Sequence, residues 1–244
     1  SKPKIAVIGA GLSGLVFADA MKDKANITLF EKARGVGGRM ATRYADPYQF
    51  DHGAQFFLAK SQAFRDYLRP LEEQGVIARW DARFVEFTAR EITGERQWDG
   101  QPAHYVGAPR MNSLCKFLAE GLEVNIQQHV ARLIKSGEQW QLMDNEGKLL
   151  GLFDWVVSTA PSHQTAALFP ESFSHYTQVN AATMLGCYTL MLGFDEPLDL
   201  PFESAVVKEA DISWMSVSSA KPKRDTPFSL VALATNKWAE ENME

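Results

Sequence analysis

The sequence contains few of the residue types that mark secreted, metal-binding or membrane-spanning proteins. Only two cysteines occur in its 244 residues, Cys115 and Cys187, and their separation fits neither a metal site nor a redox pair. So few cysteines are typical of a reducing compartment. The longest apolar run, residues 184 to 194, is too short to cross a bilayer and predicts a buried strand. The first residues show no apolar segment of the signal-peptide type. We therefore expect a cytoplasmic protein without a membrane partner.

An excess of basic charge is also missing. Lys and Arg number 25 against 30 Asp and Glu, the formal net charge is −5, and no basic arm stands at either end. This balance argues against a nucleic-acid partner. With 45% hydrophobic and 23% charged residues, the chain can bury a sizeable core in one large domain or two intertwined domains.

The N-terminal part has the pattern of a βαβ unit. Residues 5 to 8 are apolar and of strand character, Leu12–Met21 is a helical stretch, and residues 27 to 30 form a second short strand. An apolar strand followed at once by a helix and another strand favours a parallel sheet, which is where dinucleotides bind in α/β proteins.

Three glycines in "IAVIGAGLSG" have the G-x-G-x-x-G spacing of a dinucleotide-binding turn. Gly9 would make the tight turn, Gly11 would let backbone amides approach a pyrophosphate, and Gly14 would let the helix lie close on the sheet. Glu31 follows 31 − 9 = 22 positions after the first glycine, where a carboxylate accepts hydrogen bonds from an unphosphorylated adenosine ribose. The alternative is a glycine-rich turn without a ligand, and the strand, helix and carboxylate together argue against it.

The stretch "EKARGVGGRM" distinguishes FAD from NAD. FAD continues past the ribose through a pyrophosphate and a ribitol chain, and it needs further bare backbone there. Gly37 and Gly38 supply that room, and Arg39 supplies a cation for the phosphates. The same three residues alone would equally fit a flexible surface turn. Because they follow Glu31 so closely, they favour a non-covalent FAD.

Helix signals are clear at two further places. Ser61 predicts an N-cap, with an apolar face after it, although Pro70 should kink or end that helix early. Residues 111 to 120 predict another helix whose apolar face includes Cys115, which we interpret as a core residue.

The remaining elements are mostly strands. Residues 83 to 88 and 97 to 99 predict antiparallel hairpins, and residues 155 to 159 predict a buried strand. A second sheet is expected from residues 184 to 194 and from three further strands near 203–208, 212–218 and 228–235.

The end of the sequence predicts an unfinished helix. Asn236 has the character of an N-cap, and "KWAEENME" continues as helical turns without a closing glycine or cation. We therefore expect these residues to be part of a longer protein whose C-terminal cofactor-binding segment is missing.

A family resemblance follows from motifs spread along the chain. "VIGAGLSGL", "EKARGVGGRMATR", "FDHGAQFF", "YVGAPRMNSL" and "VVSTAPSHQ" resemble, in order, the motifs of the flavin-containing amine oxidase superfamily. "GGRMATR", "DHGAQFF" and "ISWMSVSSAKPKR" are most similar to its renalase-like branch. The likeness extends from Lys4 to about Trp238 and is most specific near the N-terminus.

The resemblance implies an α/β fold with a Rossmann-like FAD-binding domain in several segments and an inserted α+β substrate domain built on a mixed sheet. On this basis we expect FAD-binding segments at residues 1 to 76 and 105 to 165, and substrate-domain segments at 77 to 104 and 166 to 244.

The family's binding residues carry over position by position. The turn and Arg39 would hold the pyrophosphate, Glu31 the ribose, and residues 52 to 55 would pass the flavin ring. Residues 128 to 130 would lie beside the adenine through backbone contacts, although plain strand packing explains Val130 and Thr159 equally well. The candidate cofactor-binding residues are Gly9, Ala10, Gly11, Leu12, Ser13, Gly14, Glu31, Lys32, Gly38, Arg39, Met40, His52, Gly53, Ala54, Gln55, Val130, Thr159, Ala160 and Pro161.

The renalase-like branch implies oxidation of the 2- and 6-dihydro isomers of NAD(P)H to NAD(P)+, with hydride passing to flavin and then electrons to O2, which gives H2O2. No side chain is expected to act as a catalytic nucleophile or to bind a metal, because flavin carries this chemistry. Trp214, Lys221 and Arg224 are candidate substrate-binding residues, since an aromatic strand beside a basic turn suits a planar anion. Lys223 stands in that turn where the family pattern has glycine, and a solvated turn is the alternative.

Two other function classes stay open at this point. One is a flavin amine oxidase or a related flavin desaturase, whose substrate would be an amine or another small molecule. The other is a non-catalytic module that binds FAD or NAD.

Overall fold

The computed structural model describes residues 1 to 243, and these fall into two compact units. Unit 1 comprises Ser1–Arg39 and Cys115–Met184, and unit 2 comprises Met40–Leu114 and Leu185–Glu244. Two interleaved units were expected, but their boundaries differ from the predicted ones. Residues 40 to 76, which we assigned to the first domain, belong to unit 2, because β4 (Tyr48–Asp51) contacts β18 (Ser229–Ala234) of the same unit.

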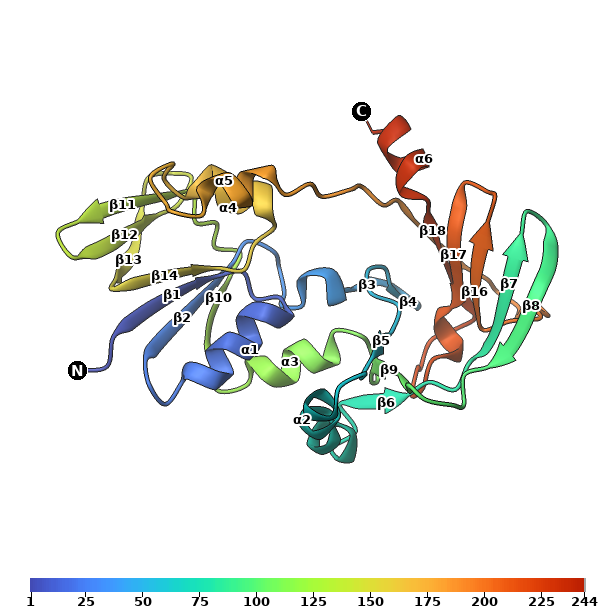
Figure 1. The fold of residues 1–244 in the computed structure, drawn as a ribbon. Coiled ribbons are helices and arrows are strands. Elements are labelled where there is room, and N and C mark those ends of the chain that lie inside the picture. The colour runs from blue at the N-terminus through green and yellow to red at the C-terminus, as the bar shows by residue number, and fades with distance from the viewer. Residues whose placement is uncertain (244) are drawn as a thin grey trace. The chain divides into compact units, whose positions relative to one another are not determined.

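Unit 1 is built on a parallel sheet with the strand order β10-β2-β1-β14 (Figure 1). In chain order this is third, second, first, fourth, the arrangement found at the centre of dinucleotide-binding folds. Its strands and the helices of the unit are β1 (Lys4–Ile8), α1 (Leu12–Met21), β2 (Asn26–Glu31), β10 (Glu123–Ile126), β14 (Trp155–Ser158), α4 (Ser162–Leu168) and α5 (Tyr176–Ala181). The predicted βαβ unit is confirmed, with α1 at the predicted residues.

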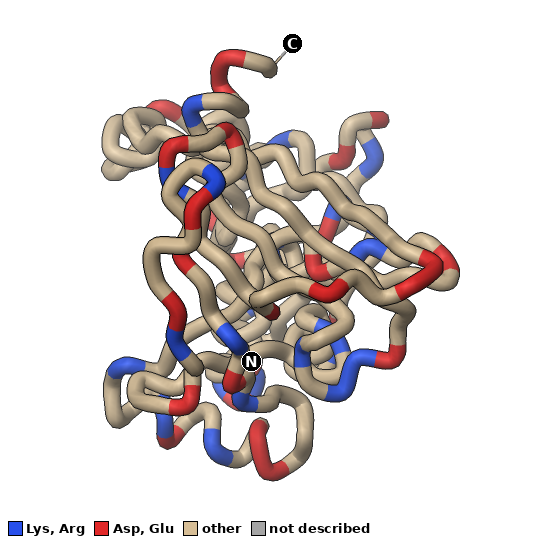
Figure 2. Tube along the Cα trace, turned by 90° about the vertical axis from the view of Figure 1, so that its right-hand side faces the viewer, with Lys and Arg blue, Asp and Glu red and all other residues tan. Residues whose placement is uncertain are grey.

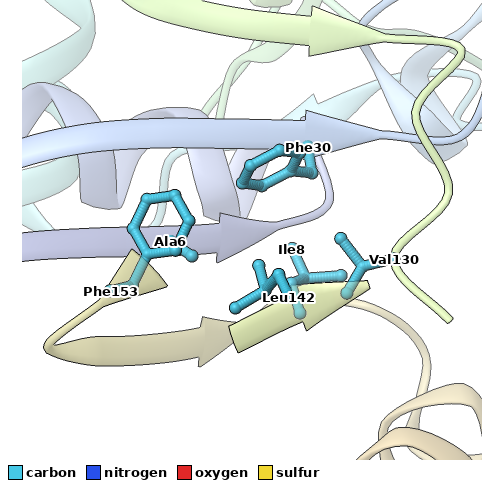
Figure 3. Close-up of a cluster of buried hydrophobic side chains, with 6 residues drawn as sticks. All are labelled: Ala6, Ile8, Phe30, Val130, Leu142 and Phe153. Carbon is cyan, nitrogen blue, oxygen red and sulfur yellow. The ribbon is translucent and has the colours of Figure 1, made fainter. Parts of the chain in front are cut away.

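The core of unit 1 forms because one face of the parallel sheet is covered by a second sheet. This antiparallel sheet consists of β11 (Arg132–Ser136), β12 (Gln139–Met143) and β13 (Leu149–Phe153). Figure 3 shows the buried cluster between them: Ala6, Ile8, Phe30, Val130, Leu142 and Phe153. On α1, Leu15 and Ala18 are fully buried, and the helix contacts β1 and β2. Apolar side chains on alternate sheet faces are thus removed from water on both sides.

Unit 2 is built on a six-stranded mixed sheet with the order β15-β18-β17-β16-β7-β8. Only β16 and β7 pair in parallel, and the other neighbours are antiparallel. Besides β18, its strands are β7 (Arg83–Thr88), β8 (Glu91–Gln97), β15 (Thr189–Gly193), β16 (Ser204–Lys208) and β17 (Ile212–Val217). The predicted second sheet is confirmed, and it is the mixed sheet that the fold class required.

Smaller elements complete unit 2. β4 pairs with β3 (Thr42–Ala45), and β9 (His104–Gly107) lies between β5 (Phe57–Leu58) and β6 (Ile77–Arg79). The helices are α2 (Gln62–Glu73), α6 (Asn236–Glu241) and the short turns η1 (Gly38–Met40) and η2 (Ser218–Ala220), while α3 (Ser113–Ala119) runs across the division between the units. In Figure 2, Lys and Arg alternate with Asp and Glu along the chain.

Several sequence expectations need correction. Ser61 does cap α2, accepting from the Phe64 N–H, but Pro70 lies inside that helix, which runs on to Glu73. The buried face of Leu68 and Leu71 holds the last turn in place despite the missing proline N–H. The strand expected over 184–194 is limited to β15, which stands at the sheet edge and pairs on one side only, so it is partly exposed rather than buried.

Other corrections concern element ends. α3 is shorter than predicted, and Cys115 is fully buried as expected. The second half of the predicted hairpin is β8, which ends at Gln97 rather than beginning there. Thr235, not Asn236, caps α6, and the helix ends at Glu241, where the Asn242 side chain donates to the Trp238 carbonyl at 2.8 Å. The reasoning from an unfinished helix is therefore wrong.

Within the described residues, none of the helices has the length and apolar character needed to cross a membrane. Residues 1 to 243 also contain no group of three His, Cys, Asp or Glu side chains placed to hold a metal ion.

Candidate functional site

The glycine-rich turn of unit 1 is fixed by close packing. Gly9 has φ 100°, the left-handed region that favours glycine, and a Cβ there would lie 2.8 Å from Oγ1 of Thr159. A Cβ on Gly14 would lie 2.1 Å from the Gly9 carbonyl oxygen. These two glycines are therefore required by the chain itself. Gly11 differs, because its Cβ would meet only Gly38 Cα at 3.9 Å and Gly37 O at 4.0 Å, which is ordinary contact.

Residues of the second glycine pair line this turn. Gly37 donates to the Ala10 carbonyl at 3.0 Å and forms a parallel bridge with Gly11. Gly38 has φ 53° and begins η1, which brings Arg39 next to the turn in the chain. Arg39 is exposed, as are Leu12 and Ser13 at the start of α1. Exposed amides at a helix N-terminus beside a free cation form a suitable place for phosphate groups.

Glu31 stands at the end of β2, buried, with only 8% of its surface exposed. One carboxylate oxygen accepts from the Ala10 N–H at 2.9 Å, and the other accepts from the Ala33 N–H at 2.8 Å. Each oxygen retains a further lone pair, so both can also accept from a ribose hydroxyl. The carboxylate is therefore oriented in advance by the same turn that would hold the phosphates.

The end of β14 closes the turn from the other side. Thr159 donates its hydroxyl hydrogen toward the carbonyls of Ile8, at 3.0 Å, and Gly9, at 3.1 Å, while its backbone N–H donates to Ile8 O at 2.9 Å. Plain strand packing does not describe this residue, which ties β14 to the turn by its side chain. Ala160 and Pro161 follow, half-buried, and lead into α4.

Two other candidates of unit 1 have different surroundings. Val130 is buried in the apolar cluster of Figure 3, so its side chain packs in the core and only its backbone could meet a ligand. Lys32 is exposed and donates to Gln164 Oε1 at 3.1 Å. The structure thus brings the turn, Glu31 and Thr159 together and leaves Val130 in the core.

In unit 2 the candidate residues surround a buried carboxylate, Asp51, which sequence reasoning did not assign. Arg224 donates to its Oδ2 at 2.6 Å, and Lys221 Nζ lies 3.5 Å from the same atom. Its Oδ1 accepts from the Thr42 hydroxyl at 2.9 Å and from the Met111 N–H at 3.1 Å. The only sequence signal was a charged residue after the apolar Phe50 in "FDHGAQFF", 173 positions from Arg224.

Burial and pairing shift the pKa values in this group. Desolvation alone would raise the pKa of Asp51, but the charges of Lys221 and Arg224, with the hydrogen bonds, hold it below its ordinary value. Burial lowers the pKa of Lys221 from 10.5 to about 8, and Asp51 opposes part of that shift. Burial also lowers the pKa of His52, as does the charge of Arg43. His52 is therefore mainly neutral at pH 7.

The expectation that Lys221 and Arg224 form an open basic turn for an anion is not matched by their positions. Their side chains are 0% and 3% exposed, and Asp51 balances one of the two charges. Lys223, between them, is exposed and has φ 59°, the conformation for which the family pattern uses glycine.

Trp214 lies in an aromatic cluster on β17. Its ring is 5.5 Å from that of Phe56, 6.0 Å from Phe84 and 6.1 Å from Trp98. His104 stacks on Trp98 with ring centroids 3.7 Å apart. Burial lowers the pKa of His104, which favours the neutral ring in this stack. A planar molecule could extend such a stack.

The remaining candidates of unit 2 are Met40, which is buried, and the segment His52, Gly53 and Ala54, which is half-buried. Gln55 is buried, and its side chain is engaged by protein partners throughout: Ser216 Oγ donates to its oxygen at 2.7 Å, and its Nε2 donates to the Asp51 carbonyl at 2.6 Å. A direct side-chain contact from Gln55 to a cofactor is therefore not what this arrangement offers.

Comparison with known proteins bears on both units. Residues 7–71 match the family described as NAD(P)-binding Rossmann-like domain. Among solved structures, a putrescine oxidase variant superposes with a TM-score of 0.73 at 11% identity, over 98% of this chain and 77% of the other. A CLA-producing fatty acid isomerase from P. acnes superposes with a TM-score of 0.72 at 10% identity, over 95% and 76%.

An oxidoreductase from Methanosarcina mazei superposes with a TM-score of 0.70 at 14% identity, over 94% of this chain and 78% of the other. Identities this low establish the fold alone. The predicted fold class is thereby confirmed: the chain carries an NAD(P)-binding Rossmann-like domain and has the mixed α/β fold of FAD-binding oxidoreductases.

Proposed function

We propose that the chain is an FAD-dependent oxidoreductase that binds its cofactor without a covalent link. The observation that carries the proposal is the turn of unit 1, where Gly11 leaves room against Gly37 and Gly38 that no side chain of the turn fills. A ligand with closely approaching phosphates accounts for that glycine, whereas the packing of the chain does not. Glu31, already oriented by two backbone N–H groups, suits the ribose.

The residues divide the cofactor between them in a definite way. The amides at the start of α1 and the Arg39 guanidinium would neutralise the pyrophosphate, and Thr159 would keep the turn in shape. Residues 52 to 54 would pass the ring. When bound, FAD would supply the acceptor for a hydride and would return two electrons to O2, which leaves as H2O2. The protein's part is to bind, orient and exclude competing reactions.

For the substrate we propose a 2- or 6-dihydro isomer of NAD(P)H, which would leave as NAD(P)+. The renalase-like motifs support this substrate, and the stacked rings around Trp214 suit a planar nicotinamide. Because Asp51 occupies Lys221 and Arg224, we do not propose them as the direct partners of the substrate phosphates. They keep a role behind the site instead.

An amine substrate is the second candidate, favoured by the likeness in fold to putrescine oxidase. Anaerobic mixing separates the two. We expect 2- or 6-dihydronicotinamide dinucleotides to bleach the flavin absorption, and benzylamine and putrescine to leave it unchanged. Bleaching by the amines alone would establish the second candidate. A purified chain that takes up no flavin, or that releases NAD on denaturation, would contradict both and point to a non-catalytic module.

A further inference from the structure

The connection between β4 and β5 has three successive carbonyl groups that are held by side chains. Gln55 Nε2 donates to the carbonyl of Asp51 at 2.6 Å and to that of Gly53 at 2.9 Å. Thr189, on β15, donates its hydroxyl hydrogen to the carbonyl of His52 at 3.0 Å. Carbonyls outside a ladder are usually left to solvent or to local turns. Here a distant strand and one glutamine satisfy all three.

The glutamine itself is fixed from behind. Ser216, fully buried on β17, donates to Gln55 Oε1 at 2.7 Å, and Lys221 Nζ donates to the same oxygen at 3.2 Å. A lysine ammonium can only donate, so it determines which end of the amide faces it. Gln55 Nε2 must therefore face the carbonyls of Asp51 and Gly53. The orientation of the amide is set by Lys221, which Asp51 holds in turn.

The N–H groups of the same segment contrast with its carbonyls. Among residues 1 to 243, the backbone N–H groups of Gly53, Ala54 and Gln55 find no acceptor. Gly53 and Ala54 are half-buried, and Gln55 is 6% exposed. Amide donors at such positions are rarely left without a partner in a working protein. They point to a ligand that offers hydrogen-bond acceptors.

We infer that Gln55 is a positioning residue: with Thr189 it retains the carbonyls of residues 51 to 53, and so keeps the N–H groups of residues 53 to 55 as donors to the acceptor atoms of the bound flavin. This inference rests on the proposed function. It replaces a direct cofactor contact by the Gln55 side chain with an indirect one, through the backbone. The carbonyl oxygens and ring nitrogens of a flavin are acceptors of the required kind.

Amide hydrogen exchange, measured by mass spectrometry with and without saturating FAD, tests the inference. In the unaltered chain we expect FAD to slow exchange at residues 53 to 55 by about tenfold or more, the equivalent of one hydrogen bond. Gln55→Leu should lose this slowing and should shift the visible absorption of bound flavin. The slowing at residues 10 to 14 should remain. Gln62→Leu, an exposed glutamine of α2 in the same unit, is the matched control.

A second variant guards against a folding defect in Gln55→Leu. Gln55→Glu keeps an acceptor for Lys221 and Ser216 but replaces the donors to the carbonyls, so it should fold and still lose the slowing at residues 53 to 55. Slowing at residues 10 to 14 with none at 53 to 55, or equal slowing in all variants, would overturn the inference alone. No slowing at either place would overturn the proposed cofactor and the inference with it.

Discussion

Replacing Asp51 by asparagine should cost a large part of the stability of unit 2. The substitution keeps the shape and the acceptor for Thr42 and Met111, but it removes the charge that balances Lys221 and Arg224. Both cations are almost fully buried, with side chains 0% and 3% exposed. Removing one partner from a buried ion pair typically costs about 3–5 kcal/mol, because the remaining charge cannot reach water.

The assay is urea unfolding followed by tryptophan fluorescence. Trp80 lies under Lys221, with Nζ 5.5 Å from the ring centroid, and Trp98 and Trp214 belong to the same unit, so the signal reports this region. Asp51→Asn should lower the free energy of unfolding by that amount at pH 7. In the double variant with Lys221→Met, part of the loss should return, since one uncompensated cation is gone.

Two results would refute this reasoning. A loss below about 1 kcal/mol for Asp51→Asn would show that the cations reach solvent or another anion, because a buried unpaired charge costs several times more. A further loss on adding Lys221→Met to Asp51→Asn would show that the lysine stabilises the unit by packing rather than burdening it with charge. The matched control is Asp66→Asn on α2, whose carboxylate is half-exposed and pairs with Arg69 at the surface.

Four other changes have defined outcomes. Arg39→Ala should weaken FAD binding by about 1.5–3 kcal/mol, as for a lost charge-assisted contact, in a fluorescence titration; unchanged affinity would remove Arg39 from the site. Gly14→Ala should abolish FAD binding and destabilise unit 1 by about 1–3 kcal/mol, because its Cβ would lie 2.1 Å from Gly9 O, and a normal melting curve would contradict this. Thr159→Val should lower the FAD affinity about tenfold, for one lost hydrogen bond, while Thr93→Val on β8 should not. Finally, the pKa of Lys221 is about 8 in the folded chain against an ordinary 10.5, so the unfolded chain holds that proton more tightly. The unaltered chain should therefore gain stability relative to Lys221→Met as the pH rises from 8 to 10.5, and a falling difference would contradict the assignment.

Local patterns in the sequence were sufficient for the elements that contact their chain neighbours. The βαβ unit follows from a glycine spacing and an apolar period, and the strand β7 was predicted at its observed residues. Pro70 was misjudged because its effect on α2 depends on tertiary packing of Leu71, which no local pattern contains. The extent of β15 was misjudged because its position at a sheet edge depends on pairing with β18.

The candidate site divides in the same way. Glycines and Glu31 act through backbone geometry within a few dozen residues, so their roles could be anticipated. Asp51 meets Lys221 across 170 positions and Gln55 meets Ser216 across 161, and neither pairing leaves a trace in local periodicity. Lys221 therefore looked like a surface cation in the sequence, although it is one of the largest fully buried side chains.

The interleaving of the two units has a consequence for synthesis on the ribosome. Strand β1 needs β14 as a neighbour, with Ile5 opposite Trp155, so 155 − 5 = 150 residues separate the two partners. At roughly 5–20 residues per second, β1 waits about 8–30 s before that edge can be covered. Strand β7 waits similarly for β16, since Phe84 pairs with Ser204. Nascent chains of this protein thus expose unpaired strands for many seconds, and their yield in cells should depend on chaperones that bind emerging polypeptide.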